Sequence, residues 1–432
     1  MQHEQHYRGR NRSRKSKSVS ISIPIAIPIP MPKVQSYSTV SMKVLSVTTL
    51  FPNNMKPNHG VFVKERLTRL AALPDVELKV IAPVPYFPKW KISHRWEYSQ
   101  VHKREVIENL DIQHPRYFIT PKFGMPFYGY FMAASLYPAI KKIQKKFDFN
   151  VIDSHYVYPD GFAAVQIGRI LKIPVTITAR GSDINLFSKF CTIRPLLRNC
   201  LNNADRIITV SQKLKDSILD LGIMPEKIHV IPNGVDCDKF RPIPKTTARE
   251  QLGLPQDVKI VLAVGNLVEL KGFDIIVKSI KKLRDVDGYR DLRLIIAGEG
   301  NRREYLQQMI DALELADIVS LKGNIPHKKL YQWYNAADLF CLASSREGWP
   351  NVILESLACG TPVVATNVGG IPEILTSRHV GFICDRDEKS IADSIQSALF
   401  QSWDHERIVR YAQNHTWEQA ALSVYRVLEK TL

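Results

Sequence analysis

The sequence lacks paired cysteines, long apolar runs and the fingerprint of a nicotinamide site, and each absence narrows the class of protein. None of its six cysteines forms a CxxC pair, so we expect no zinc site and a reducing compartment. No segment after Met42 is long and apolar enough to span a bilayer. GxGxxG is missing from the first predicted loop, which argues against a dinucleotide. The 432 residues, 45% of them hydrophobic, suit about two folded domains with two cores.

Residues 1–41 have the composition of a segment outside the fold. Basic residues from Arg8 to Lys17 precede an apolar run that is interrupted by prolines at 24, 28, 30 and 32. Proline at that density is incompatible with a helix or an internal strand, and it disrupts the signal peptide that the pattern imitates. We expect this extension to be disordered or to precede the natural start, so that Met42 begins the first core strand.

The charge is unevenly distributed along the chain. Residues 1–41 carry a net charge of +6, residues 42–235 carry +12 and residues 236–432 carry −1, within a total of +17. A cationic front half suits an anionic lipid surface, a polyphosphate carrier or a nucleic acid, and solubility alone is the alternative. No RRM, KH, zinc or helix-turn-helix pattern is present, so we expect no nucleic-acid partner.

Hydrophobic periodicity predicts an α/β protein. Short β-branched runs alternate with amphipathic segments, as in a parallel doubly wound sheet, and the series restarts near residues 233–245. We predict two Rossmann-like domains facing across a cleft, 42–233 and 234–405, followed by a helix at 406–432 that could cross back to the first domain. The predicted strands are 43–50, 77–83, 150–155, 174–179, 205–210, 228–231, 259–264, 292–297, 318–322, 339–343, 362–366 and 380–384, and the clearest helices are 61–73, 128–147, 157–171, 211–222 and 404–430.

The segment 345–366 carries two carboxylates on either side of a helix start. Asn351 is expected to cap that helix, and the amides after it, including that of Val352, offer donors and a positive dipole end to a phosphate. Glu355 lies one turn beyond Asn351 on the same face and can accept hydrogen bonds from a ribose diol. Glu347, on the preceding loop, can meet sugar hydroxyls. The pattern favours a sugar-nucleotide site.

Polar loops follow predicted strands of the first domain. Because ligands of open α/β sheets bind at the carboxyl ends of the strands, His155, Arg180 and Asp183 are expected to line the rim of the cleft. Gly60 ends the first loop and allows a sugar or an acceptor to approach closely. A structural histidine and a plain connecting loop are the alternatives.

Glycines and a lysine follow strands of the second domain. Lys271 can reach a diphosphate, and the glycine pair before Pro372 forms a second anion cradle beside Glu347. Two further strand-end turns, 297–300 and 322–327, could frame a nucleobase or be plain turn chemistry; the second ends at His327. The residues expected to hold the donor in these loops are Gly265, Asn266, Gly298, Gly369 and Gly370.

Metal binding is weighed on three DxD triplets. None follows a core strand with its carboxylates clearly aimed at the cleft, and helix capping explains them better. We expect no metal at any of them; the triplets are 236–238, 285–287 and 385–387.

Taken together, these motifs resemble the retaining glycosyltransferases of family 4, which have the GT-B fold, and the resemblance runs from about Met42 to the C-terminus. Within the family, enzymes of bacterial cell-envelope and extracellular polysaccharide synthesis, including teichuronic acid synthesis, are most similar in the loops 51–63 and 178–185. Two positions depart from the family pattern: Asn266 replaces a usual arginine, and Arg180 replaces a frequent histidine. The segments that carry the resemblance are Glu347 to Glu355 (E-x7-E), 233–236 (the interdomain motif), 267–272 (the lysine loop) and 368–370 (the glycine loop).

The resemblance implies transfer of a glycosyl unit from a nucleoside diphosphate sugar to a glycan or a lipid-linked acceptor, with retention and without a metal or cofactor. Lys271, the glycine-pair amides and the helix start would stabilise the departing diphosphate. Glu355 would hold the ribose and Glu347 the donor sugar, while Arg180 and His155 would meet the reacting sugar from the other domain. An inactive nucleotide-sugar-binding relative and a nucleotide-sugar epimerase are the alternatives. The base, the sugar, the acceptor, the linkage and the oligomeric state are not specified.

An aromatic segment, 117–131, contains Lys122 and precedes a helix with four lysines, Lys141, Lys142, Lys145 and Lys146. We interpret it as a peripheral docking surface for the anionic inner leaflet of the cytoplasmic membrane. A buried aromatic core with a solvated lysine face is the alternative.

Overall fold

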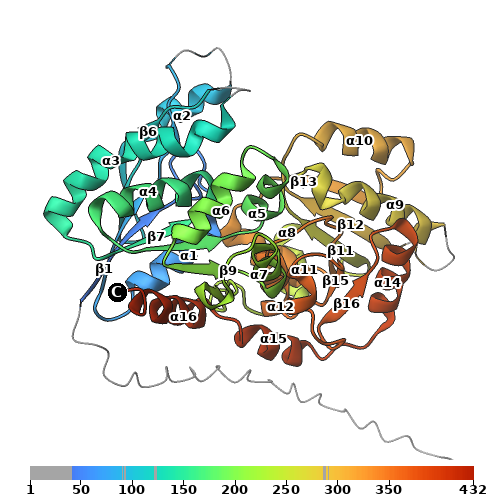
Figure 1. Cartoon of the computed structure of the whole chain (residues 1–432). Helices are drawn as coiled ribbons and strands as arrows, with labels where there is room; N and C mark the ends of the chain where they lie inside the picture. The colour runs from blue at the N-terminus through green and yellow to red at the C-terminus, as the bar shows by residue number, and fades with distance from the viewer. Residues whose placement is uncertain (1–40, 90, 92–93, 121–123, 286–288, 290) are drawn as a thin grey trace, which may run out of the picture. The chain divides into compact units, whose positions relative to one another are not determined.

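The computed structural model describes residues 41–89, 91, 94–120, 124–285, 289 and 291–432 (Figure 1). The expectation for the N-terminal extension, and the positions of Lys122 and Asp287, therefore lie outside the described residues. Residues 41–432 form one compact unit. It contains two large sheets with helices packed against them, so the predicted α/β class is confirmed.

The first sheet has eight strands in the order β10-β9-β8-β7-β1-β2-β5-β4. All neighbours are parallel except β4 and β5, which form an antiparallel hairpin at the edge. This hairpin was not predicted; its turn residues Glu108 and Asn109 both have positive φ, which fits a tight two-residue turn. The strands are β1 (Met42–Val47), β2 (Val76–Ile81), β4 (Arg104–Ile107), β5 (Leu110–Gln113), β7 (Val151–His155), β8 (Val175–Ala179), β9 (Arg206–Thr209) and β10 (Ile228–Val230), and β3 (Val84–Pro85) pairs separately with β6 (Arg116–Tyr117).

Seven helices accompany this sheet in the described part of the chain. The predicted helix 128–147 is confirmed, whereas residues 157–161 form a separate turn ahead of α4, and α6 was not predicted. Within the described chain, α3 packs on α4, and α4 on α6 (Figure 1). The helices are α1 (Val61–Ala71), α2 (Glu97–Gln100), α3 (Tyr128–Phe147), α4 (Phe162–Leu171), α5 (Ser182–Asn185), α6 (Arg194–Asn203) and α7 (Gln212–Leu219).

The second sheet is entirely parallel, with the order β13-β12-β11-β14-β15-β16. Every predicted strand of this half is found within about two residues of its predicted bounds, because both faces of a covered parallel sheet demand continuous apolar runs. The strands are β11 (Lys259–Val264), β12 (Leu292–Ala297), β13 (Val319–Gly323), β14 (Leu339–Leu342), β15 (Val363–Thr366) and β16 (Gly381–Cys384).

The last predicted helix is two helices, α15 and α16. Thr416 caps α16 in a capping box. Its hydroxyl accepts the backbone N–H of Gln419, and the side-chain oxygen of Gln419 accepts the backbone N–H of Thr416. α16 then packs on α1 of the first sheet, where Arg69 pairs with Glu418 at 2.6 Å. The helices of this half are α8 (Lys245–Leu252), α9 (Phe273–Arg284), α10 (Arg303–Ala312), α11 (Leu330–Ala336), α12 (Asn351–Ala358), α13 (Ile371–Ile374), α14 (Glu388–Phe400), α15 (His405–Gln413) and α16 (Trp417–Glu429).

The two buried cores are divided differently from the expected one per domain. Alternate residues of β11 enter different clusters: Ile260 and Leu262 join the core that continues into the first sheet, while Val261 and Ala263 join the core on the opposite face. This follows from the two-residue period of a strand. The first core therefore contains residues of both sheets and joins them. All six cysteines are unpaired thiols. Among the described helices, none combines the length and apolarity needed to cross a bilayer.

Candidate active site

Loops from the two sheets meet in direct backbone contact. A Cβ atom on Gly348, in the loop after β14, would lie 2.2 Å from the carbonyl oxygen of Arg180, in the loop after β8. A Cβ on Gly181 would likewise lie 2.9 Å from the Cα of Gly348. Only glycine at positions 181 and 348 permits this approach, so these two residues allow the carboxyl ends of the two sheets to meet.

Glu347 and Lys271 are neighbours in this junction, as the predicted site requires. Lys271 Nζ lies 2.5 Å from Glu347 Oε1, and the Ser344 hydroxyl donates to the same oxygen at 2.6 Å. Lys271 ends a short helical turn that Gly272 terminates with φ 65°. A Cβ on Gly272 would lie 2.2 Å from the carbonyl oxygen of Ala343, so this glycine seats the lysine loop against the end of β14.

Glu355 lies in α12, with only 6% of its surface exposed. Each carboxylate oxygen has one donor: His327 Nε2 lies 2.8 Å from Oε1, and the Tyr334 hydroxyl lies 3.0 Å from Oε2. The burial of Tyr334 and its proximity to Glu355 raise the pKa of its hydroxyl well above the usual value, so this group remains a donor. Glu355 also lines a cavity of about 170 Å³.

That cavity has walls from both halves of the chain. The first half contributes the start of α1, including Gly60 and Phe62, and the second half contributes Asn351 and His327. Gly60 was predicted to lie at the cleft, and the structure puts it there. Its φ of 65° and the 2.3 Å between its would-be Cβ and the backbone of Leu50 require glycine.

The prediction that Asn351 caps α12 is wrong. Asn351 is the first helical residue, Pro350 precedes it, and no side-chain cap is present. Instead, Asn351 Oδ1 accepts a hydrogen bond from Asn233 Nδ2 at 3.1 Å, because the two halves meet here. The first-turn amides of Asn351 and Val352 still lack intrahelical acceptors, as in any helix start.

The glycine pair is close to Glu347 but is only partly available as an anion cradle. A Cβ on Gly369 (φ 56°) would lie 1.9 Å from the carbonyl oxygen of Glu347, so this loop packs directly on the Glu347 loop. The predicted cradle uses the amides of the glycine pair, but the N–H of Gly370 donates to the carbonyl of Gly348 at 3.2 Å. Closure of the Glu347 loop onto the glycine pair explains the difference.

The remaining predicted donor residues follow the carboxyl ends of β11 and β12 in the second sheet. A Cβ on Gly298 would lie 1.8 Å from the carbonyl oxygen of Gly265, so the ends of β11 and β12 touch through these glycines. The space next to Gly265 is bounded by the side chain of Lys271, at 3.8 Å from its would-be Cβ. Asn266 is exposed beside them.

His155 and Arg180 do not line an open rim, as was predicted, but lie buried in a polar chain. His155 is fully buried and Arg180 is 9% exposed. Arg180 Nη2 lies 2.7 Å from His155 Nδ1, and Arg180 Nη1 donates to Asn233 Oδ1 at 2.9 Å. Because a guanidinium only donates, His155 Nδ1 accepts, and its protonated Nε2 faces Asp153 Oδ2 at 3.1 Å. The chain of contacts thus runs from β7 through Asn233 to the start of α12.

Burial controls the charge states in this chain. It lowers the pKa of His155 to about 4, against the opposing influence of Asp153, so the imidazole is neutral near pH 7. Burial likewise lowers the pKa of Arg180 well below its usual value, with a further contribution from the neighbouring Arg66. The contacts with each other and with Asn233 position both predicted residues within the polar chain.

Asp183 was also predicted to line the cleft, and the structure contradicts this. It is fully buried, and its carboxylate accepts the backbone amides of Val157, Arg180 and Gly181 at 2.7 to 3.1 Å. Asp183 thus fixes the loop after β8, because its carboxylate is fully buried and is hydrogen-bonded to these backbone amides and does not face a cleft. Sequence position alone could not distinguish the two roles.

Three of the DxD aspartates that the structure describes have structural partners, and one of them, Asp285, pairs with Lys281 at 2.9 Å. Asp236 pairs with Arg69 at 2.9 Å and accepts the amides of Asp238 and Lys239. Asp387 caps α14 through the amide of Ser390. Among the described residues, no group of three or more histidine, cysteine or acidic side chains is arranged to hold a metal ion.

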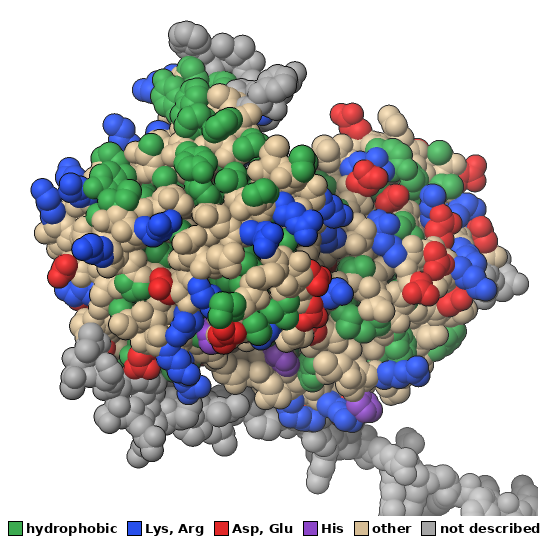
Figure 2. All heavy atoms as spheres, in the orientation of Figure 1, with side chains coloured by type: hydrophobic (Ala, Val, Ile, Leu, Met, Phe, Trp, Pro, Cys, Tyr) green, Lys and Arg blue, Asp and Glu red, His purple; other side chains and the backbone are tan. Residues whose placement is uncertain are grey.

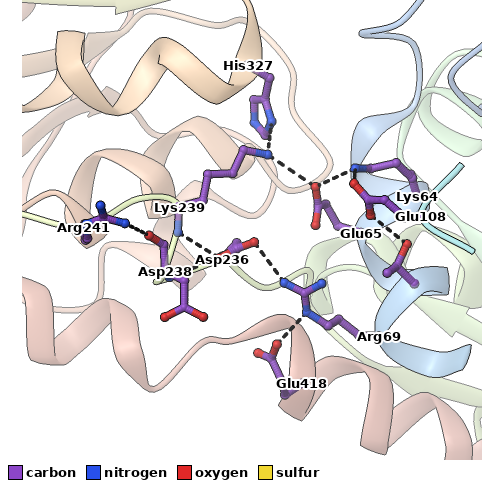
Figure 3. A network of polar contacts seen from close by, with 11 residues as sticks. Lys64, Glu65, Arg69, Glu108, Asp236, Asp238, Lys239, Arg241, His327 and Glu418 are labelled. Atoms are coloured by element: carbon purple, nitrogen blue, oxygen red, sulfur yellow. Dashed lines mark hydrogen bonds and ion pairs between the residues drawn. The ribbon is translucent and has the colours of Figure 1, made fainter. Parts of the chain in front are cut away.

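The partners of Glu347 and Glu355, apart from Lys271, were not predicted. His327 was noted only as the end of a strand-end turn, and Tyr334, Ser344 and Lys239 were not singled out. Lys239 Nζ lies 2.9 Å from His327 Nδ1 and 3.4 Å from Glu65 Oε1, which Figure 3 shows as one continuous network. Their positions depend on pairings between distant segments, which a local pattern does not report.

Family profiles identify the class of protein that this fold and site define. The profile described as "Glycosyl transferases group 1" matches residues 244–415, and that described as "Glycosyltransferase Family 4" matches residues 68–239. Together they span about four-fifths of the chain. The chain belongs to this glycosyltransferase family, and the predicted transferase activity class and GT-B fold are confirmed.

Individual relatives agree with this assignment. The chain is 27% identical to TuaC of Bacillus subtilis (strain 168), a glycosyltransferase whose name assigns it provisionally to teichuronic acid biosynthesis, over 85% of this chain and 90% of TuaC. Its fold is similar to that of sucrose-phosphate synthase from Thermosynechococcus elongatus, with a TM-score of 0.72 and 19% identity over 90% of this chain and 98% of that one. Anabaena HepE in complex with UDP aligns with a TM-score of 0.69 and 18% identity, over 90% of this chain and all of HepE.

Proposed function

We propose that the protein transfers a sugar from a nucleoside diphosphate donor to a glycan or lipid-linked acceptor in envelope or extracellular polysaccharide synthesis. The observation that carries the proposal is the convergence of Lys271, Glu347 and the start of α12 at the junction of the two sheets. Similarity to TuaC over nearly its whole length supports a polysaccharide product. The donor would lie against the second sheet and the acceptor against the first.

The proposed contribution of the protein is electrostatic. As the glycosidic C–O bond breaks, negative charge grows on the diphosphate, and a positioned cation stabilises it most where water is excluded. Lys271 is 20% exposed and pairs with Glu347. Donor binding would transfer the lysine to the diphosphate and release Glu347 to sugar hydroxyls. The first-turn amides of α12 would supply further donors at the same end of the sheet.

Retention and metal independence are part of the proposal. Front-face departure and attack through an oxocarbenium-like state would place the acceptor hydroxyl beside the departing diphosphate, which needs no enzyme nucleophile. Lys271 would take the charge-stabilising role that a divalent cation has elsewhere. Anomeric NMR of the product tests retention, and unchanged turnover in excess EDTA tests metal independence; inversion or full loss of turnover would overturn the respective part.

The donor is tested by thermal shift and by turnover. UDP, GDP, ADP and their sugars are screened, and only the matched nucleotide should raise the melting temperature strongly, by mass action on the folded state. Mass spectrometry of the same donors with polyprenyl-linked and free glycan acceptors then detects transfer. Binding without transfer or hydrolysis would favour an inactive relative, and an altered sugar with free nucleotide and no acceptor would favour an epimerase.

We further propose that the first half docks on an anionic membrane surface at the cytoplasmic face. Phe118, Phe127 and Tyr130 are exposed to 54%, 58% and 50%, and Phe118 and Phe127 each contact Phe131, with ring centroids 5.6 and 6.3 Å apart. Figure 2 shows hydrophobic side chains gathered at this end of the molecule with basic side chains beside them. The four lysines of the second half of α3 are exposed: Lys141, Lys142, Lys145 and Lys146.

Liposome flotation tests the docking surface. The protein should float with vesicles that contain phosphatidylglycerol and much less with neutral vesicles, because both apolar area and anionic attraction contribute. Replacing Phe118 and Phe127 with Ser should weaken flotation. Phe400→Ser, at a 77% exposed position on α14, is the matched control. Equal flotation on neutral and anionic vesicles, or equal effects of both variants, would remove the docking proposal.

A further inference from the structure

The ribose-binding role proposed for Glu355 needs a carboxylate held in one orientation. Its two oxygens already accept one hydrogen bond each, from His327 and from the buried Tyr334. A carboxylate has about four acceptor sites, so a second lone pair on each oxygen is left for a ligand diol. The side chain lines the cavity, at its junction with both halves of the chain. The donors around Glu355 therefore decide how the remaining lone pairs are aimed.

The tautomer of His327 is fixed by its other neighbour. Lys239 Nζ lies 2.9 Å from His327 Nδ1, and an ammonium group can only donate. His327 Nδ1 therefore accepts, and the ring hydrogen is on Nε2. That hydrogen points to Glu355 Oε1 at 2.8 Å. Lys239 thus determines that His327 is a donor to Glu355 and not a competing acceptor.

Lys239 is in turn held by a residue of the first half. Its ammonium lies 3.4 Å from Glu65 Oε1, and Glu65, in α1, is 5% exposed. Figure 3 shows the ammonium group of Lys239 between His327 and Glu65, and Glu65 extends from α1. The cavity that Glu355 lines is bordered by the same three side chains, Glu65, Lys239 and His327. One polar chain therefore connects α1 to the carboxylate of Glu355.

We propose that His327 and Lys239 are positioning residues for ribose recognition, and that Glu65 links this orientation to contact between α1 and the second half. The inference rests on the function proposed for Glu355 and extends it. When α1 and the loop of Lys239 are together, His327 holds Glu355 ready for the 2′ and 3′ hydroxyls. When Glu65 moves away, Lys239 loses its counter-charge and the aim of Glu355 is lost. Donor affinity is thereby coupled to closure of the two halves.

A packing role for the ring is the competing explanation, since His327 also contacts Phe240 edge to face, with ring centroids 5.2 Å apart. Two substitutions separate the roles. His327→Phe keeps a ring against Phe240 and removes both nitrogens. His327→Gln loses the ring but keeps an amide N–H that reaches toward Glu355 and a carbonyl that accepts from Lys239. Positioning predicts that Gln rescues and Phe does not; packing predicts the reverse.

The measured quantity is the ratio of dissociation constants for UDP and 2′,3′-dideoxy-UDP, with the GDP and ADP pairs used if UDP does not bind. The full-length wild-type protein should prefer the ribose form by on the order of 10-fold, as expected for hydrogen bonds to a charged group. His327→Phe should bring the ratio close to 1, with unchanged affinity for the dideoxy form, and His327→Gln should restore several-fold preference. A merely destabilised protein would weaken both ligands alike.

Matched variants complete the test. Lys239→Met should lower the ribose preference, whereas Lys329→Met, at an exposed position two residues after His327, should not. Glu355→Ala tests the ribose-binding role of Glu355 separately from its positioning by His327 and Lys239. Without a loss of ribose preference in Glu355→Ala, the proposed function of Glu355 fails. With that loss, but with normal preference in His327→Phe or Lys239→Met, the positioning inference alone is overturned.

Discussion

Asp160 offers a prediction whose size can be worked from the structure. It follows β7 and is fully buried, and its carboxylate contacts the backbone amide of Thr49, while the Thr49 hydroxyl donates to it at 3.1 Å. These contacts connect β7 to the loop after β1, which leads to Gly60. Burial is the largest influence and raises the pKa of Asp160 to about 7, although both bonds to Thr49 oppose the rise.

The direction of the pH dependence follows from the two protonation states. Asp160 in the unfolded chain loses its proton near its ordinary value of 3.8, whereas the folded protein keeps the proton up to about pH 7. The folded state therefore binds the extra proton between these values, and its stability falls as pH rises. Linkage gives a loss of about 1.4 kcal/mol per pH unit in that window, and about 2–3 kcal/mol between pH 5 and pH 8.

Asp160→Asn removes this titration and keeps both contacts, since an amide oxygen can accept from the Thr49 amide and its NH2 can donate to the hydroxyl. The free energy of unfolding in urea is measured for both proteins at pH 5 and pH 8. The advantage of the variant over wild type should grow by about 2–3 kcal/mol across that range. Asp393→Asn, at an exposed position, is the control. A wild-type minus variant difference that does not change with pH would refute the reasoning.

Three further predictions concern the junction of the sheets. Gly348→Ala puts a methyl group 2.2 Å from the carbonyl oxygen of Arg180, so it should destabilise by about 1–3 kcal/mol or more and reduce turnover, as measured by thermal unfolding and donor consumption; an unchanged melting temperature would contradict the backbone contact. Glu373→Ala removes the carboxylate that accepts two amides at the start of α7, at 2.7 and 2.9 Å, and should cost about 0.5–2 kcal/mol in urea unfolding, whereas exposed Glu304→Ala should cost little. Arg180→Met leaves His155 Nδ1 and Asn233 Oδ1 without their donor and should cost about 1–3 kcal/mol in urea unfolding, and an unchanged free energy of unfolding would show that the polar chain does not stabilise the fold.

The sequence predicts the second half of the fold and the location of its carboxylates well. Continuous apolar runs mark β11 to β16, and the spacing of Glu347 and Glu355 around Pro350 is enough to predict a loop and a helix there. Both features are local: the first depends on two-sided burial of a parallel sheet, and the second on helix periodicity. The β4–β5 hairpin was missed because its strands have four residues each and alternate apolar with polar side chains, so no continuous apolar run marks them.

Features that depend on contacts across the junction were not predictable. The Lys239–Glu65 contact joins residues 174 positions apart, and no periodicity reports such a pairing. Asp183 follows a strand as a ligand-binding residue would, but its neighbours in space are backbone amides that it must satisfy. The cap assigned to Asn351 failed for the same reason, since Asn233 from the linker between the sheets competes for its side chain.

Turnover by Lys271→Met tests the central claim most directly. With the matched donor at saturation, kcat for nucleoside diphosphate release should fall by about 10²–10³-fold, the range for removal of one preorganised charge-stabilising group. Lys278→Met, which removes a largely exposed lysine of α9, should leave kcat within about twofold of wild type, as expected for a surface ion pair. A Lys271→Met protein that folds, binds donor and releases product at the wild-type rate would contradict the claim that this lysine stabilises the leaving diphosphate.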